Sequence, residues 1–217
     1  MIKSLLHFND SANLAKDTIR DVLWTVNGTV ASSPNGKFGK CLSMNNNGYL
    51  QNNTIDLSLD KEWTLDMWSN ATSYARTSTF SINSGPSYSP RQGIFIENGD
   101  LYFANKRNNT WDNYPLDLPS NVWVHFAIVN TLSTIYGFVN GVKKVEYPNN
   151  DVNMTSTPEV LIGLDRTISS TFIGLIDEFR ISNIALWTSD FTPPVHETSI
   201  AKCIFIDKNN TVMGMKE

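Results

Sequence analysis

The stretch from Val122 to Lys144, which reads VWVHFAIVNTLSTIYGFVNGVKK, is the feature that most constrains the fold. Two alternating runs flank a short polar turn, and Asn140-Gly141 then begins a second, tighter turn. Asn-Gly accepts positive φ at both central positions of a two-residue hairpin. The stretch therefore predicts a three-stranded antiparallel meander, and repetition of such units along the chain predicts a β-sandwich.

Short strand-like segments separated by turn residues recur along the 217 residues of the chain. Asn-Gly alone occurs at 27–28, 35–36, 98–99 and 140–141. No segment of ten or more residues carries a convincing helical stripe of apolar side chains. Regular short strands with this punctuation are typical of a sandwich or barrel, so we predict one all-β domain over residues 1–192.

The predicted strand Trp63–Asn70 shows how one strand divides its side chains between two faces. Successive residues point to opposite sides, so the apolar odd-numbered residues up to Met67 share one face. The other face carries Thr64 and Asp66 beside Trp68. We expect this second face to be partly exposed to water.

The composition changes after Thr192-Pro193-Pro194, because two prolines cannot continue a central strand. Residues 199–217 contain an apolar run, a DKNN turn and a second short strand. We therefore predict a C-terminal extension over residues 193–217 that forms a hairpin. An isolated hairpin is only marginally stable, so this one should dock on the sandwich, pair with another chain or serve in assembly.

Bulk properties exclude several classes of protein. A net charge of −4 argues against a nucleic-acid binder, and no apolar run reaches the roughly 18 residues of a membrane span. The N-terminus, MIKSLLHFNDS, lacks the long apolar region and cleavage site of a signal peptide. Without export, Cys41 and Cys203 are better interpreted as two buried thiols than as one disulfide.

Five segments together resemble a known family. They are LLHFNDS at 5–11, FGKCLSMNNNGYL at 38–50, WTLDMWSN at 63–70, the meander at 122–144, and FIGLIDEFRISNIAL at 172–186. In this order they resemble the concanavalin A-like lectin/glucanase superfamily, in its laminin-G-like (pentraxin-like) branch. The resemblance implies a two-sheet antiparallel jelly-roll sandwich. It says much less about function, because many activities share this fold.

The resemblance also implies a structural Ca²⁺ ion. In the related glucanases a cation often joins the N-terminal strand, a loop glycine and an aspartate on the last strand. The matching positions here are Asn9 or Asp10, Gly48, and Asp177, which offer the oxygen ligands that Ca²⁺ prefers. The alternative is that Asp177 is buried with Arg180 or a backbone N–H group as its partner.

Glycosidase chemistry needs two carboxylates about 5–5.5 Å or 6.5–9.5 Å apart. The related glucanases carry Glu-x-Asp-x-x-Glu on one strand, and this chain has no such run. Asp177 and Glu178 are adjacent, so we expect them to point to opposite faces. The remaining candidates Glu97, Asp112 and Asp117 are scattered near turns. We therefore predict that the protein is not an enzyme.

Three histidines were considered for catalysis or metal binding. His125 lies in an alternating run, but a catalytic triad also needs a nucleophile and an orienting acid, which the spacing does not supply. We interpret His125 as hydrogen-bonded to a neighbour in its sheet. His7 and His196 have no patterned partners, so no zinc site is expected.

Two segments between predicted strands combine aromatic rings with polar side chains, as sugar-binding sites do. Residues 105–118 and 84–92 are both rich in such residues. The alternative is that the two aromatic residues of the first segment pack back onto their own sheet. The candidate ligand-binding residues are Trp111, Tyr114, Arg107, Asn109, Tyr88 and Arg91.

These observations favour a non-catalytic recognition or adhesion module with a glycan or host-surface polysaccharide as partner. The Asn-rich composition, the absent signal peptide and the C-terminal hairpin fit a phage or other viral particle, on its tail, fibre or capsid. A bacterial surface module would need an export route that the N-terminus does not show. The main alternative is a structural assembly domain without a sugar ligand, whose hairpin adds strands to a sheet of another subunit.

Overall fold

The computed structural model describes residues 1–20, 22–74, 77–83, 93–105, 107–108, 110–152, 154, 157–164, 171–199, 204–206 and 212–215. Its regular elements are strands and one short 3-10 turn, η1 (Asn149–Asp151), which confirms the all-β prediction. No described helix is long and apolar enough to cross a membrane. The strands are β1 (Ile2–Leu6), β2 (Lys16–Asp17), β3 (Val22–Leu23), β4 (Thr25–Ser33), β5 (Cys41–Asn52), β6 (Trp63–Ala71), β7 (Ser78–Asn83), β8 (Gly93–Glu97), β9 (Asp100–Asn105), β10 (Thr110–Pro115), β11 (Val124–Asn130), β12 (Thr134–Val139), β13 (Val142–Pro148), β14 (Glu159–Ile162), β15 (Ile173–Ser182), β16 (Ile204–Ile206) and β17 (Val212–Met215).

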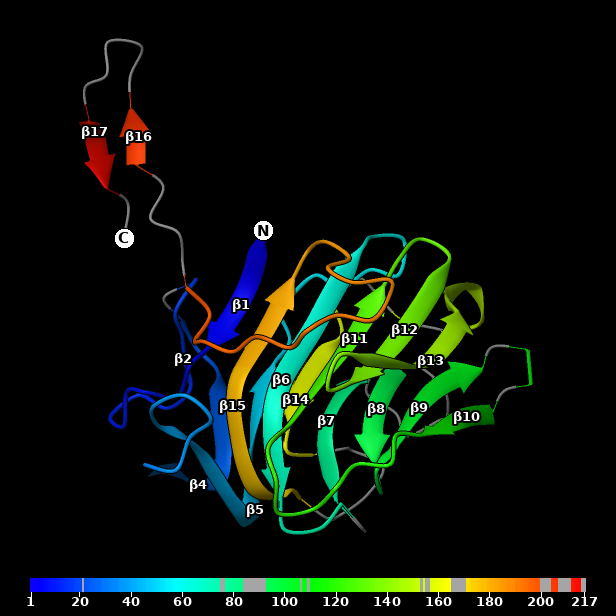
Figure 1. Cartoon of the computed structure of the whole chain (residues 1–217), viewed down its shortest axis with the longest axis horizontal. Coiled ribbons are helices and arrows are strands. Elements are labelled where there is room, and N and C mark those ends of the chain that lie inside the picture. The colour runs from blue at the N-terminus through cyan, green and yellow to red at the C-terminus, as the bar shows by residue number, and fades with distance from the viewer. Residues whose placement is uncertain are drawn as a thin grey trace.

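The strands form two packed layers, as Figure 1 shows. The first layer contains β1, β15, β6, β11, β12 and β13, and the second contains β4, β5, β14, β7, β8, β9 and β10. Neighbouring strands pair antiparallel throughout. The layers are continuous at one side, where the beginning of β5 pairs with the beginning of β15. This arrangement is the predicted two-sheet antiparallel jelly-roll sandwich.

Aromatic rings from the two layers meet in the core. Phe80 of β7 stacks on Phe126 of β11 with ring centroids 5.8 Å apart, and Phe103 of β9 stacks on Tyr147 of β13 at 4.6 Å. Each strand contributes its inward-facing side chains to this core because alternate residues point to opposite faces. Burying one phenylalanine side chain stabilises the fold by about 1.5–3 kcal/mol. The outer faces of the two layers are then left to carry other chemistry.

The predicted meander is confirmed as β11, β12 and β13. Val139 pairs with Val142, so Asn140 and Gly141 form a two-residue loop. Their φ angles of 49° and 79° are the positive values that this tight turn requires.

Residues 183–199, called here the C-terminal segment, cross the outer face of the first layer. Its Ala185, Trp187 and Phe191 pack against apolar residues of β11 and β12, and the Phe191 N–H donates to the Gly141 carbonyl at 2.9 Å. The face that carries Thr64, Asp66 and Trp68 is therefore buried. The expectation that this face is partly wet was wrong, because the sequence gave no sign of the covering segment.

β16 and β17 pair antiparallel as a separate two-stranded sheet, which confirms the predicted C-terminal hairpin. Its role in docking or assembly stays a prediction. Cys41 is a buried free thiol, and burial raises its pKa to about 11. Cys203 lies outside the described residues, so its pairing stays untested.

Candidate functional site

The outer face of the second layer carries one continuous row of side chains, called here the outer row. Residues directly opposite each other in antiparallel strands share a face. Six intervals between these seven strands, at about 4.8 Å each, give the row a length of about 29 Å. The row consists of Thr25, Gln51, Leu161, Ser81, Phe95, Tyr102 and Asn113.

One end of the outer row is aromatic. Phe95 of β8 stacks on Tyr102 of β9, with ring centroids 4.8 Å apart and planes within 7° of each other. The Trp111 ring of β10 meets Phe95 edge-on, also at 4.8 Å. Tyr102 and Trp111 are half-buried. Asn113 donates to the Asp100 carboxylate at 3.0 Å beside them. Three rings and an amide therefore share one partly accessible surface.

The other end of the face is lined with amide and carboxylate groups. Asn27 donates to the Gln51 side-chain oxygen at 3.3 Å, and Gln51 in turn donates to Glu159 at 2.5 Å. All three side chains are half-buried. An amide has two N–H donors and two acceptor lone pairs, so one bond to a neighbour orients it without using its full capacity. Such oriented amides can bind hydroxyl groups.

The predicted ligand loop at residues 105–118 is largely a strand. Trp111 and Tyr114 both belong to β10, and because they are three residues apart they point to opposite faces. Tyr114 contacts Phe103 and Tyr147 with ring centroids 5.8 Å away in each case, so it packs on the core as the alternative held. Trp111 alone of this pair lies on the outer face.

The other predicted ligand residues are not brought to this surface by the described structure. Arg107 is exposed and its Nε atom forms an ion pair with Asp151 at 2.8 Å. Asn109, Tyr88 and Arg91 lie outside the described residues.

Sequence reasoning missed Phe95 and Tyr102, although a signal was present. The Asn98-Gly99 turn pairs Glu97 with Asp100, and this register places Phe95 opposite Tyr102. Applied to this turn, the rule that identified the meander would have found the aromatic pair.

A second cluster lies where β1 ends. His7 Nδ1 is 2.5 Å from Glu178 Oε1, while Glu178 Oε2 accepts the Thr198 N–H at 2.7 Å. Glu197 of the C-terminal segment accepts a hydrogen bond from the Asn9 amide. Ligand-type atoms of His7, Glu178 and Glu197 all lie within 4.8 Å of one another. We call these three residues the His7 cluster.

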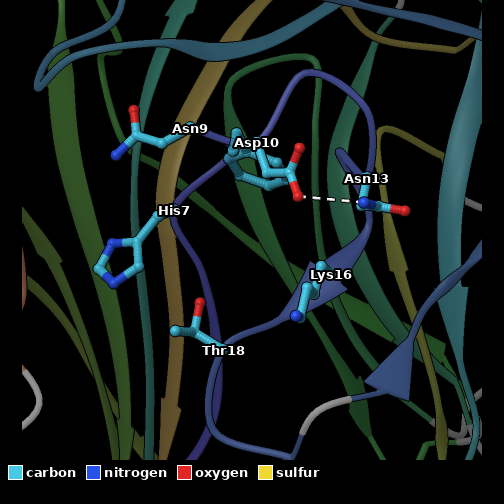
Figure 2. Close-up of a pocket in the computed structure, with 7 residues that line it drawn as sticks. His7, Asn9, Asp10, Asn13, Lys16 and Thr18 are labelled. Atoms are coloured by element: carbon cyan, nitrogen blue, oxygen red, sulfur yellow. Dashed lines mark hydrogen bonds between the residues drawn. The ribbon is translucent and has the colours of Figure 1, made fainter.

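Charge and access around His7 are unusual for a histidine near the surface. Burial alone would lower the pKa of His7, but the hydrogen bond to Glu178 and the nearby carboxylates raise it above 6.5. His7 also lines a pocket of about 290 Å³, drawn in Figure 2. The other lining residues are Phe8, Asn9, Asp10, Asn13, Lys16 and Thr18.

A β-bulge places Glu178 beside His7. The register of β15 shifts between Asp177 and Arg180, and Glu178 has a positive φ of 52°. Ile176 and Phe179 on either side both belong to the core, so the two carboxylates between them face away from it. The expectation that Asp177 and Glu178 point to opposite faces was therefore wrong.

Two of the four predicted calcium ligands approach one loop. The Asp177 carboxylate accepts the N–H groups of Phe38 and Glu178, each at 2.9 Å, and burial raises its pKa to about 7. Asn9 Oδ1 accepts the Lys40 N–H at 2.8 Å. Backbone N–H groups thus partner Asp177, as one of the two alternatives proposed.

The other two predicted calcium ligands lie apart from this loop. Asp10 accepts hydrogen bonds from Ala12 and Asn13 in its own turn (Figure 2). Gly48 pairs with Gly28, seven residues along β5 from Cys41, or about 23 Å of strand. The four residues therefore do not form one ligand set.

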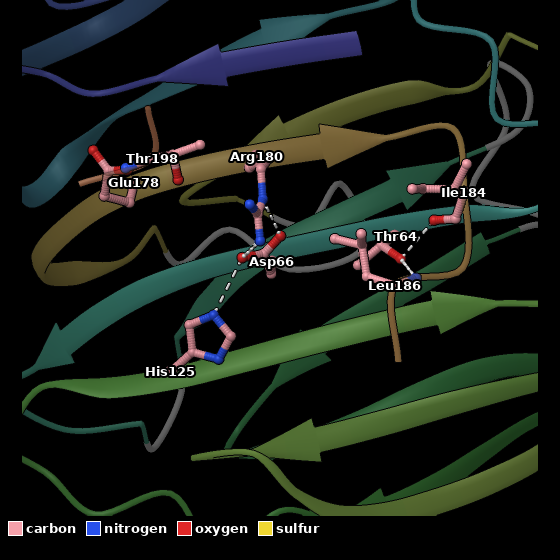
Figure 3. Close-up of polar contacts among 8 residues, drawn as sticks. All are labelled: Thr64, Asp66, His125, Glu178, Arg180, Ile184, Leu186 and Thr198. Atoms are coloured by element: carbon pink, nitrogen blue, oxygen red, sulfur yellow. Dashed lines mark hydrogen bonds and ion pairs between the residues drawn. The ribbon is translucent and has the colours of Figure 1, made fainter. Parts of the chain in front are cut away.

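A buried charged cluster lies beneath the C-terminal segment (Figure 3). Arg180 donates to both oxygens of Asp66, at 2.8 and 2.9 Å, and His125 Nε2 lies 3.2 Å from the same carboxylate. This contact confirms the interpretation of His125 as a residue bonded to its neighbour. Within the described part of the chain, no hydroxyl or thiol bonds to its Nδ1 atom, so no catalytic triad is formed.

Comparison with known protein families gave one match. Residues 44–190 fit the family model described as the concanavalin A-like lectin/glucanases superfamily. A comparison with curated proteins gave no match.

Solved structures with the same fold include sugar-bound domains. Domain 4 of AbnA, a GH43 extracellular arabinanase from Geobacillus stearothermophilus, was solved in complex with arabinotriose. It superposes with a TM-score of 0.70 at 22% identity, over 86% of this chain and 94% of that domain. The botulinum neurotoxin serotype D ligand-binding domain, in complex with N-acetylneuraminic acid, gives a TM-score of 0.60 at 17% identity, over 86% of this chain and 48% of that one. This chain therefore spans about half of the toxin domain.

Proposed function

Because the chain belongs to the concanavalin A-like lectin/glucanase superfamily, we propose that it is a non-catalytic module that binds carbohydrate on the outer row. The aromatic surface of Phe95, Tyr102 and Trp111 is the observation that carries the proposal. Aromatic rings bind the apolar faces of sugars, and oriented amides such as Gln51 bind their hydroxyl groups. The sugar-bound structures of the same fold support a carbohydrate as the partner.

The length of the outer row favours an oligosaccharide over a single sugar. Rings lie at one end and linked amides lie toward the other, along a row of about 29 Å. A chain of several sugars can contact both ends at once, whereas one sugar ring can contact only one.

A glycan array with matched variants tests this proposal. Trp111→Ala should weaken binding about tenfold, since losing one stacking ring costs about 1.5 kcal/mol. Tyr136→Ala is the control, because Tyr136 is a half-buried aromatic residue of the first layer. The array is run with and without Ca²⁺, because calcium stays a prediction. No binding under either condition would contradict carbohydrate recognition, and unchanged binding by Trp111→Ala would exclude this face.

A second candidate function, structural assembly, is favoured by the C-terminal hairpin. β16 and β17 form their own sheet and are not hydrogen-bonded to the sandwich strands of the described chain. Either function would suit a virion or another extracellular-facing assembly, on which the module contacts a host surface.

Deleting residues 200–217 separates the two functions and leaves the C-terminal segment in place. Loss of multimers with retained glycan binding would assign the hairpin to assembly. An unchanged oligomeric state would exclude the assembly role.

A further inference from the structure

We propose that the His7 cluster binds one divalent transition-metal ion, for which Zn²⁺ is the best match. The ion would join three segments that are distant in sequence: the end of β1, the bulge of β15 and the C-terminal segment. The proposal concerns different residues from the outer row, and it does not depend on carbohydrate binding.

The separation of the ligand atoms is close to what a tetrahedral ion requires. Zinc bound to nitrogen and oxygen at about 2.0–2.2 Å places neighbouring ligand atoms about 3.3 Å apart. His7 Nδ1 and Glu178 Oε1 are 2.5 Å apart, and none of the three ligand atoms is more than 4.8 Å from another. Rotation of side chains by less than about 1.5 Å would bring all three to that geometry.

Contacts outside the cluster orient both carboxylates. The backbone N–H of Thr198 holds Glu178 Oε2, which leaves Oε1 directed at His7. The Asn9 amide holds Glu197 from the other side. Such secondary contacts are typical of metal sites, where they fix the direction of each ligand.

The ligand types select the class of cation. Two carboxylates beside a neutral imidazole carry two negative charges in a partly buried place, which a dication would neutralise. An imidazole nitrogen suits zinc, copper or nickel, whereas Ca²⁺ takes six to eight oxygen ligands. Three protein ligands leave the fourth position to water, and the pocket that His7 lines provides access to it.

The sequence analysis excluded zinc because His7 has no patterned partner. The spacing between ligands is long, since His7 and Glu178 are 171 residues apart. A site assembled from three distant segments leaves no local motif, so only the folded chain reveals it.

Calorimetric titration of the full chain, first treated with EDTA, tests the proposal. ZnCl₂ should bind at one ion per chain and raise the thermal unfolding midpoint, because an ion that binds only the folded state stabilises it. Glu197→Gln should weaken Zn²⁺ binding at least tenfold, and His7→Ala should do so as well. Glu197 is exposed, so its variant is expected to fold normally, as a circular dichroism spectrum will check.

His196→Ala is the matched control, since His196 is an exposed imidazole next to Glu197 that belongs to no cluster ligand set. Its Zn²⁺ affinity should equal that of the wild type. Absence of Zn²⁺ binding, equal affinity in Glu197→Gln, or loss of affinity in His196→Ala would overturn the proposal. Tighter binding of CaCl₂ than of ZnCl₂ would overturn the assigned class of cation.

Discussion

Replacing Arg180 with methionine tests whether the buried charged cluster supports the first layer. Arg180 donates two hydrogen bonds to Asp66, whose exposed fraction is only 3%. Removing one partner of a buried ion pair costs about 3–5 kcal/mol, because the other charge is left uncompensated. The Arg180 side chain is 13% exposed, so we expect the lower end, about 3 kcal/mol of unfolding free energy.

A double variant shows whether the stranded charge causes the loss. Asp66→Asn in the Arg180→Met background removes that charge and keeps a polar partner for His125. The double variant should therefore recover about 1–2 kcal/mol relative to Arg180→Met alone. Urea denaturation at pH 7, followed by tryptophan fluorescence and circular dichroism, measures both values. A cost below about 1 kcal/mol for Arg180→Met would show that the pair behaves like an exposed one, and a less stable double variant would refute the charge argument.

Three further predictions follow from single buried positions. In EDTA, the wild type should lose about 4 kcal/mol of stability between pH 4 and pH 7, because burial raises the pKa of Asp177 from 3.8 to about 7 and the neutral carboxyl is favoured only in the folded state. Asp177→Asn should remove this slope, and parallel pH profiles of denaturation midpoints would contradict it. Gly141→Ala should lower the unfolding midpoint and speed amide exchange at Phe191, because a Cβ there would lie 1.9 Å from the Phe191 carbonyl oxygen; unchanged exchange would refute the contact. In a Cys203→Ser variant, Cys41 should react with a thiol reagent only in urea, and rapid labelling of the native protein would disprove its burial.

The sequence predicted features that depend on neighbours along the chain. The meander and its Asn140-Gly141 loop follow from local alternation and from one dipeptide that accepts positive φ. The same local logic gives the register of Phe95 opposite Tyr102, which forms the aromatic part of the candidate site.

Features that depend on distant segments were missed. The bulge at Glu178 adds one residue to the strand, and strict alternation from Asp177 onward therefore assigns the wrong face. The burial of Asp66 depends on the C-terminal segment, whose irregular backbone carries no periodic pattern. His7 meets its carboxylate partners only after the two ends of the sandwich come together.

The pairing of β1 with β15 sets a limit on when the sandwich can close. Leu6 pairs with Phe179, 173 residues further along the chain. At about 5–20 residues per second, a ribosome needs roughly 10–35 s to make that stretch. During this time the first strand has an open hydrogen-bonding edge and no native partner, so chaperones or early collapse must protect it until translation is nearly finished.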